Sequence, residues 1–307
     1  SRLLAPITLV ALTALSLEIR TKLDTLFCIA AFAIKKNNDK GVVYVSSGEG
    51  TTSQGDYHEA LNWASREKAP VIFHIENNGY AISVPIKDQT SGSSIYKISS
   101  GYENLHRIKI DGTDYFESLL AFKLATDRAR KGLGPTMIES IVVRLLPHSS
   151  SDDHRKYRSE EEIQNDKMND PIEKFINECV ENKIINIKEF DNIRSNVSII
   201  IDNDTLWAEK QNDPSDHMAN LFSEENEFNI KLNEQDNSIV YVDAINHALD
   251  EELLNNDKML VYGQDVAGGK GGVFTATRGL TDKHGKERVF NSPLAESSII
   301  GTAIGMA

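Results

Sequence analysis

The feature that most restricts the fold is a stretch from Val42 to Pro85, in which a glycine-rich turn and a polar segment separate two apolar runs. The first run, Val42 to Val45, leads into Ser-Ser-Gly-Glu-Gly, and the second, Val71 to Ile75, leads into Glu-Asn-Asn-Gly-Tyr. The segment between them has helical character, so the stretch predicts one strand–helix–strand unit. Strands joined in this way lie parallel, with a right-handed crossover in almost all proteins.

The polar residues after these two strands are expected to meet. If the strands are neighbours, their carboxyl ends lie side by side, and ligands bind at that edge of open parallel sheets. Glu49 and Asn78 would then converge, and a helix start capped by Ser53 with Asp56 would direct backbone N–H groups toward an anion. A carboxylate, an amide oxygen and a glycine-rich turn form the kind of site that binds Mg²⁺ together with phosphate.

A purely structural interpretation of the same residues stays open at this point. Gly48 and Gly50 would then serve only a tight strand-to-helix turn, Glu49 would be solvated, and Asn77–Gly79 would be an ordinary turn.

Composition narrows the class of protein. The chain has 307 residues, enough for two domains or one large α/β domain. Its net charge of −13 argues against a nucleic acid or an anionic membrane as partner, because both require clustered Lys and Arg. Two cysteines, Cys28 and Cys179, exclude a disulfide scaffold and fit a reducing compartment, so we expect a cytoplasmic protein.

The rest of the chain continues the alternation of helices and strands. Helices are expected over 24–36, 115–131, 170–182 and 187–199, and strands over 107–110 and 136–145. A further helix is expected to start at Ser159, where Glu162 gives the same capping pattern as Ser53 with Asp56. This rhythm predicts an α/β fold with a doubly wound parallel sheet. The apolar run 3–17 is interrupted by Pro6 and is too short to span a membrane, so we expect a buried helix there.

The composition changes after the first domain. Residues 202–238 are rich in Asp, Glu and Asn and predict an acidic linker. Beyond it, helices are expected over 240–255 and 275–284, a strand over 259–261, and a final helix of small residues. The predicted organisation is therefore a domain over 1–201, a linker over 202–238 and a second domain over 239–307.

A polar loop that begins at Pro147-His148 follows the strand predicted over 136–145, and so faces the same sheet edge as Glu49. An imidazole there can donate or accept a proton near neutral pH. A solvated loop histidine is the alternative.

Taken together, these motifs resemble a known family. Gly48-Glu49-Gly50, residues 51–76 and Asn77-Asn78 resemble the thiamine diphosphate fingerprint in the form with Glu found in branched-chain 2-oxo acid dehydrogenases. HSSSDD at 148–153, GQDV at 263–266, GKGGVF at 269–274 and RVFNSPLAE at 288–296 resemble further segments of the decarboxylating component of these complexes, in the same order. The first part resembles the alpha subunit and residues 239–307 the start of the beta subunit, as in an incomplete alpha-beta fusion.

The resemblance implies a sheet of the thiamine diphosphate-binding type, followed by the start of a second similar domain. It implies Mg²⁺ held by Glu49, Asn78 and the carbonyl of Tyr80. It implies thiamine diphosphate held by the turn of Gly48, Gly50 and Thr51.

The resemblance also implies the roles of other residues. His148 matches the alpha-side histidine near the reacting carbon, and Arg144 belongs to the segment that orders over the cofactor. Glu296 matches the beta-side glutamate that activates the aminopyrimidine ring of a cofactor across an interface, which implies a homo-oligomer such as a dimer. The implied activity is decarboxylation of a branched-chain 2-oxo acid or pyruvate, with acyl transfer to the lipoyl acyltransferase component.

Two positions depart from the family pattern. Glu76 stands where the branched-chain enzymes place an arginine on the diphosphate, and Gln264 replaces the acid of Gly-Glu-Asp-Val. Two other functions therefore stay open. One is another thiamine-dependent enzyme, acetoin dehydrogenase or transketolase-like, and the other is a catalytically inactive assembly module. The sequence does not identify the 2-oxo acid.

Overall fold

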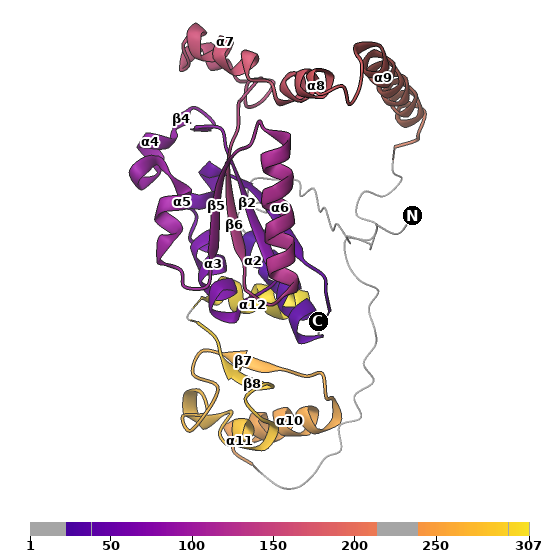
Figure 1. The fold of residues 1–307 in the computed structure, drawn as a ribbon. Helices are drawn as coiled ribbons and strands as arrows, with labels where there is room; N and C mark the ends of the chain where they lie inside the picture. The colour runs from indigo at the N-terminus through magenta and orange to yellow at the C-terminus, as the bar shows by residue number, and fades with distance from the viewer. Residues whose placement is uncertain (1–22, 38, 214–238, 294, 307) are drawn as a thin grey trace. The chain divides into compact units, whose positions relative to one another are not determined.

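The computed structural model describes residues 23–37, 39–213, 239–293 and 295–306 (Figure 1). They form two compact units. One contains the described residues up to Phe175 together with those from Val242 onward, and the other contains those between Ile176 and Tyr241. The helix expected over 3–17, Leu294 and most of the expected linker lie outside the described residues.

A four-stranded parallel sheet lies at the centre of the first unit (Figure 1). Its strands, in spatial order, are β1 (Val43–Gly48), β2 (Val71–Asn77), β6 (Thr136–Ile141) and β5 (His106–Asp111). Each neighbouring pair is parallel, which confirms the predicted direction of the strands. The apolar runs form strands because β-branched residues suit a pleated surface that is buried on both faces.

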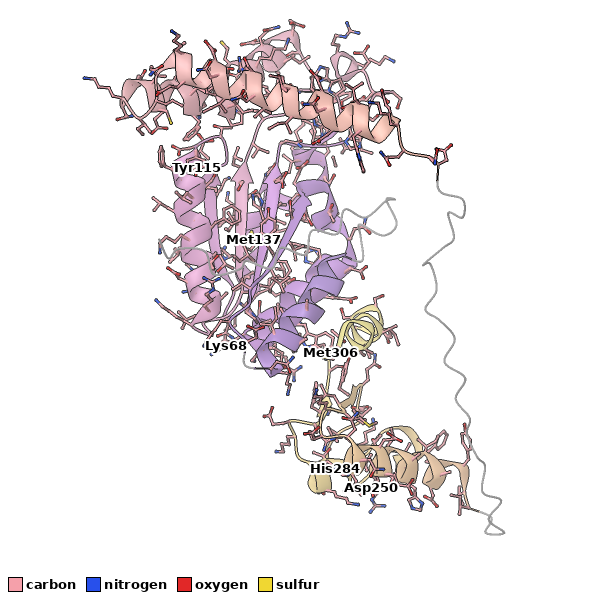
Figure 2. The ribbon with its side chains drawn as sticks, turned by 90° about the vertical axis from the view of Figure 1, so that its right-hand side faces the viewer. Lys68, Tyr115, Met137, Asp250, His284 and Met306 are labelled. Carbon is pink, nitrogen blue, oxygen red and sulfur yellow. The ribbon has the colours of Figure 1, made fainter. Side chains whose placement is uncertain are left out.

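One face of the sheet is covered by α2 (Leu23–Lys36), α3 (Gly55–Glu67) and the short α5 (Ile95–Ile98). Alternate strand residues point toward these helices, and Met137, labelled in Figure 2, is fully buried among them. The buried side chains of this layer are Ala31, Val43, Val45, Tyr57, Ala60, Leu61, Ala64, Ala69, Val71, Phe73, Ile75, Ile95, Leu105 and Met137.

The other face is covered by α6 (Tyr115–Arg130). Ala121 and Ala125 of this helix pack on Ile72, Ile110 and Ile138 of the sheet. Small side chains bring the helix close to the strands. The Asp114 side chain caps the helix by accepting a hydrogen bond from Glu117 N at 2.9 Å.

Two helix starts were predicted from Ser-x-x-acid patterns, with different outcomes. The Ser159 hydroxyl accepts from Glu162 N at 3.1 Å at the start of α7 (Glu160–Met168), as predicted. The prediction for Ser53 was wrong. It ends a 3-10 turn, η1 (Glu49–Ser53), and Gln54 is the N-cap of α3 without a side-chain hydrogen bond. The 3-10 turn tightens the backbone and moves the helix start by one residue.

Short elements connect β2 to β5. A hairpin of β3 (Tyr80–Ala81) and β4 (Val84–Pro85) follows β2 directly. After it come α4 (Ile86–Gln89), η2 (Ser91–Ser93), α5 and η3 (Ser99–Gly101). A single turn, η4 (His154–Lys156), lies between β6 and α7.

Two helices, α8 (Pro171–Glu181) and α9 (Ile187–Glu209), follow α7. Helix α9 is longer than expected, so residues 202–209, predicted as the start of the linker, are helical. Its Asn186 and Glu189 form a capping box. Within the described part of the chain, no helix has the length and apolar character needed to span a membrane.

The carboxy-terminal segment begins with α10 (Tyr241–Asn255) and contains the parallel strands β7 (Val261–Gly263) and β8 (Val289–Asn291), then α12 (Glu296–Met306). Leu253, Leu280 and Val289 form its apolar cluster. Asp250 accepts from the His284 ring at 2.7 Å (Figure 2).

The helix predicted over 275–284 was too long. The structure has a turn, η5 (Val273–Thr275), and then α11 (Leu280–His284). Phe274, Thr275 and Gly279 have positive φ, which a continuous right-handed helix does not allow.

The contact of α6 with the sheet generates a prediction about stability. We expect A125L to lower the free energy of unfolding by about 1–3 kcal/mol, because Ala125 is fully buried and a larger side chain overpacks the interface. L124Q, one residue earlier at a position 48% exposed, should change it by less than about 0.5 kcal/mol. Denaturant unfolding of both variants measures the difference, and equal effects would contradict this packing.

Candidate functional site

The site lies at the carboxyl edge of the central sheet. Strand β1 ends at Gly48 and β2 at Asn77, and the two strands pair in parallel register. The residues just after them meet as predicted, because the backbone N–H of Asn78 donates to Glu49 Oε2 at 3.2 Å. The two sequence motifs therefore form one feature of the molecule.

Glu49 is a buried carboxylate that is only partly satisfied. Its exposed fraction is 1%, and Oε1 has no hydrogen-bond partner among the described residues. Burial raises its pKa, against the lowering effect of backbone N–H groups and of the Arg144 charge. A buried, unpaired oxygen is costly in a ligand-free fold, and a bound cation would satisfy it. This overturns the interpretation of Glu49 as a solvated residue.

The turn after β2 is held by its own side chains. Asn77 Oδ1 accepts from Gly79 N at 3.0 Å, and Asn78 Oδ1 accepts from Tyr80 N at 3.1 Å. Gly79 has φ +84°, a conformation that favours glycine. The turn therefore directs Asn78 and the Tyr80 backbone back toward the end of β1.

Gly50 lets the two loops approach each other. A Cβ atom on this residue would lie 2.8 Å from the Cβ of Ala81 in the hairpin. By contrast, nothing lies within 4 Å of a Cβ placed on Gly48. Thr51 lies in the same 3-10 turn as Gly50. The turn and the hairpin thus form two sides of a narrow site around Glu49.

Arg144 joins this edge from the segment after β6. Its Nη2 donates to the Tyr80 carbonyl at 2.6 Å and its Nη1 to the Ile82 carbonyl. The guanidinium therefore fixes the backbone of the β3–β4 hairpin. The Tyr80 oxygen can still accept a second partner, because a carbonyl has two lone pairs.

Arg158 is a functional candidate that the sequence analysis missed. Its side chain is 1% exposed. It donates to the Arg144 carbonyl at 3.0 Å and pairs with Glu162 and Asp166. Its spacing to Glu162, four residues along the chain, was the available signal. A buried arginine with two acidic partners anchors the whole segment after β6.

His148 lies in a loop organised by Asp152. The His148 backbone N–H donates to Asp152 Oδ2 at 3.0 Å, and Tyr157 OH donates to the same oxygen at 2.6 Å. These hydrogen bonds lower the pKa of Asp152. His148 is exposed. Its backbone is held by Asp152, and the structure does not assign a role to its imidazole.

Glu296 stands at the start of α12, and Gln264 Nε2 donates to its Oε1 at 2.9 Å. This hydrogen bond is the main cause of a lowered pKa for Glu296. Among the described residues, no hydrogen bond or ion pair joins Glu296 to Glu49, Asn78 or His148. Hydrogen bonds thus join Glu49, Asn78, the Tyr80 backbone and Arg144, and among the described residues none joins His148 or Glu296 directly to Glu49 or Asn78.

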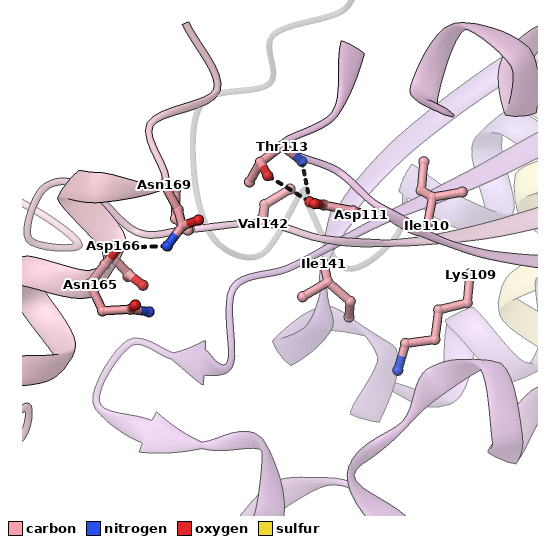
Figure 3. A pocket seen from close by; sticks show the side chains of 10 residues that line it. Lys109, Ile110, Asp111, Thr113, Ile141, Val142, Asn165, Asp166 and Asn169 are labelled. Carbon is pink, nitrogen blue, oxygen red and sulfur yellow. Dashed lines mark hydrogen bonds between the residues drawn. The ribbon is translucent and has the colours of Figure 1, made fainter. Parts of the chain in front are cut away.

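A cavity of about 570 Å³ lies beside the carboxyl ends of β5 and β6 (Figure 3). Its carboxylates have partners in the protein: Asp111 bonds Thr113 and Lys174, and Asp166 bonds Arg158. Its lining residues are Lys109, Ile110, Asp111, Thr113, Ile141, Val142, Val143, Asn165, Asp166 and Asn169. Glu49, Asn78 and His148 do not line it.

These features define an α/β domain with a doubly wound parallel sheet and a polar site at its carboxyl edge. Family comparison agrees with this class. Residues 13–216 match the family described as dehydrogenase E1 component, and residues 237–307 match the transketolase pyrimidine-binding domain. The first match covers more than half of the chain, so the protein belongs to the dehydrogenase E1 component family.

Similar proteins include alpha subunits from three bacteria. The chain is 46% identical over 129 residues to 2-oxoisovalerate dehydrogenase subunit alpha of Bacillus subtilis (strain 168), covering 42% of the chain and 39% of the relative. The chain is 40% identical over 146 residues to 3-methyl-2-oxobutanoate dehydrogenase subunit alpha of Mycobacterium tuberculosis (strain ATCC 25618 / H37Rv), covering 48% of the chain and 40% of the relative. It is 39% identical over 154 residues to pyruvate dehydrogenase E1 component subunit alpha of Staphylococcus aureus (strain Mu50 / ATCC 700699), covering 50% of the chain and 41% of the relative. The match spans about two fifths of each relative.

The burial of Glu49 generates a prediction about pH. Its raised pKa means that ionisation destabilises the ligand-free fold as the pH rises through that pKa. We expect E49Q to increase the free energy of unfolding at pH 8, and the gain to shrink as the pH falls and to vanish at about pH 3, below the ordinary pKa of about 4.3, where the wild-type carboxyl is protonated in both states. Thermal unfolding at several pH values measures this.

The matched control is E103Q, which changes an exposed carboxylate before β5 and should alter stability little at any pH. If E49Q destabilised the chain at both ends of the pH range, the carboxylate would be required by the ligand-free fold and the argument from its unpaired oxygen would be wrong.

Proposed function

We propose that this chain supplies the thiamine diphosphate- and Mg²⁺-binding part of a 2-oxo acid dehydrogenase, the component that decarboxylates the substrate. The observation that carries the proposal is Glu49, a buried carboxylate with one unpaired oxygen, beside Asn78 at the carboxyl edge of a parallel sheet. Mg²⁺ in enzymes takes one or two protein carboxylates and completes its shell with phosphate oxygens and water. No group of three or more His, Cys, Asp or Glu able to hold a metal occurs among the described residues, which suits such a site.

The residues present fit this cofactor. Glu49, the Asn78 amide and the Tyr80 carbonyl would hold Mg²⁺, and the backbone of the turn at Gly48, Gly50 and Thr51 would face the diphosphate. Thiamine diphosphate, when bound, supplies the electron sink for decarboxylation. The close approach of Gly50 to the hairpin leaves no room for a side chain at this position, because a Cβ atom would lie 2.8 Å from the Ala81 Cβ.

The remaining site residues would act around the bound cofactor. Arg144 would hold the hairpin and the loop after β6 in place, and His148 would donate or accept a proton at the substrate. Glu296 would act on the aminopyrimidine ring at a site in another chain, which requires a homo-oligomer. Its hydrogen bond from Gln264 favours the ionised form at neutral pH.

The proposed reaction is oxidative decarboxylation of a branched-chain 2-oxo acid or pyruvate, with acyl transfer to the lipoyl domain of an acyltransferase in a cytoplasmic complex. The names of the similar alpha subunits support both substrate classes and do not choose between them. An inactive assembly module is the second candidate, favoured by Glu76 at the end of β2, where the resemblance implies an arginine.

Titration of thiamine diphosphate by calorimetry, with and without Mg²⁺, tests the proposal. We expect Mg²⁺-dependent binding to the wild-type chain, and a loss of at least about tenfold in affinity for E49A because a charged metal ligand is removed. The E103A variant, with an exposed acid at the other end of the sheet, should bind like the wild type. Binding that is independent of Mg²⁺ and unaffected by E49A would contradict the proposed site, and no binding to the wild type would favour the inactive module.

Glu76 provides a second test. Its carboxylate is half exposed and accepts a hydrogen bond from Ser46. We expect E76R to raise the affinity for thiamine diphosphate by about tenfold, since a charge-assisted hydrogen bond to a diphosphate contributes roughly 1.5–3 kcal/mol. E76Q, which removes the charge without adding a donor cation, should give a smaller gain. Reduced affinity in E76R would show that position 76 does not face the diphosphate.

A further inference from the structure

A second buried carboxylate lies close to the site and has no part in the function proposed above. Glu139 is in the middle of β6, fully buried, on the face of the sheet that carries Met137 and the helices α3 and α5. A buried carboxylate is stable only when its oxygens are hydrogen bonded or paired with a cation. Its contacts therefore indicate why it is tolerated there.

Four donors surround the Glu139 carboxylate. Oε1 accepts from Asn77 Nδ2 at 2.8 Å and from Ile95 N at 3.2 Å. Oε2 accepts from Tyr96 N at 3.0 Å and from the Ser94 hydroxyl at 3.2 Å. Unlike Glu49, this carboxylate is fully satisfied within the protein, so it connects parts of the fold and leaves no oxygen for a ligand.

The contact with Asn77 links Glu139 to the candidate metal site. An amide can present either its oxygen or its nitrogen, and the Glu139 oxygen selects the orientation in which Asn77 Nδ2 points into the sheet. The amide oxygen then faces the turn and accepts from Gly79 N at 3.0 Å. This turn carries Asn78, whose backbone N–H bonds Glu49, and Tyr80.

We propose that Glu139 is a positioning residue for the metal site: through Asn77 it fixes the turn that presents Asn78 and the Tyr80 carbonyl. The identity of the metal and cofactor in this inference rests on the proposed function. The claim that Glu139 orders the turn rests on the hydrogen-bond geometry alone. Partners of metal ligands typically change metal affinity when they are altered, even though they do not touch the metal.

The test is a double-mutant cycle of E139Q and N77A, measured as the Mg²⁺ concentration needed for thiamine diphosphate binding. An amide has one acceptor oxygen, so E139Q leaves at least one of the four donors facing an N–H₂ group. We expect each single variant to raise the Mg²⁺ concentration needed by about 10- to 100-fold, because metal affinity falls. If Glu139 acts through Asn77, E139Q causes little further loss in the N77A background.

Two control variants separate positioning from general stability. S94A removes one donor from Glu139 on the α5 side and leaves Asn77 in place, and T136V alters β6 at a buried hydroxyl without a hydrogen-bond partner among the described residues. Both should keep the Mg²⁺ requirement of the wild type. If S94A raised the Mg²⁺ concentration needed as much as E139Q, or if the losses of E139Q and N77A simply added, Glu139 would act through the packing of α5 and the proposal would be overturned.

Amide hydrogen exchange of the ligand-free chain gives a readout that does not need the cofactor. E139Q and N77A should both speed exchange at Gly79, because each releases the amide oxygen that accepts its N–H, whereas S94A should not. Unchanged exchange at Gly79 in E139Q would overturn the positioning role. If the wild type failed to bind thiamine diphosphate, the proposed function would fail, and this measurement would still decide the role of Glu139.

Discussion

The parallel pairing of three adjacent strands is the constraint on which the site depends. Gly48 lies opposite Glu76, and Asn77 lies opposite Ile141, so β1, β2 and β6 end at the same edge. The segments that follow them begin within contact distance of one another. The register is held by apolar side chains buried on both faces. A slip of one residue would move every side chain of a strand to the opposite face of the sheet. The packing of the core therefore sets the position of every polar group at the edge.

Two buried carboxylates, Glu49 at this edge and Glu139 within β6, differ in how their oxygens are hydrogen bonded. Both Glu49 and Glu139 have almost no exposed surface, and their charges are unfavourable in an apolar layer. Glu139 has four hydrogen-bond donors, and these make it a rigid connection between β6, the end of β2 and α5. Glu49 keeps one oxygen without a partner among the described residues. Glu139 is therefore fully hydrogen bonded within the fold, and Glu49 is the carboxylate that would bind the cation at the proposed site.

Much of this arrangement could be predicted from local sequence. The strands, their direction and the meeting of Glu49 with Asn78 follow from the apolar runs and from the rule that ligands bind at the carboxyl ends of parallel strands. The cap at Ser53 could not be predicted, because the 3-10 turn before α3 depends on how Gly50 packs on the hairpin. Arg158 was missed although its spacing to Glu162 was an available signal, because an i,i+4 ion pair does not reveal that the arginine is buried. Glu139 was missed because its partners lie on another strand and at the start of α5, far away in the sequence. A pattern read along one segment contains no information about such contacts.

The charges at the edge indicate why an anion would depend on a cation here. Arg158 is already paired with Glu162 and Asp166, and the Arg144 guanidinium donates to two backbone carbonyls of the hairpin. Glu49 and Glu76 add negative charge near the ends of β1 and β2, in a chain whose net charge is −13. A diphosphate approaching this edge alone would meet carboxylates whose charge is not compensated. At the proposed site, a divalent cation bound to Glu49 would reverse the sign of the local potential, so the affinities for cation and diphosphate would be coupled, and each ligand would strengthen the binding of the other by the same factor.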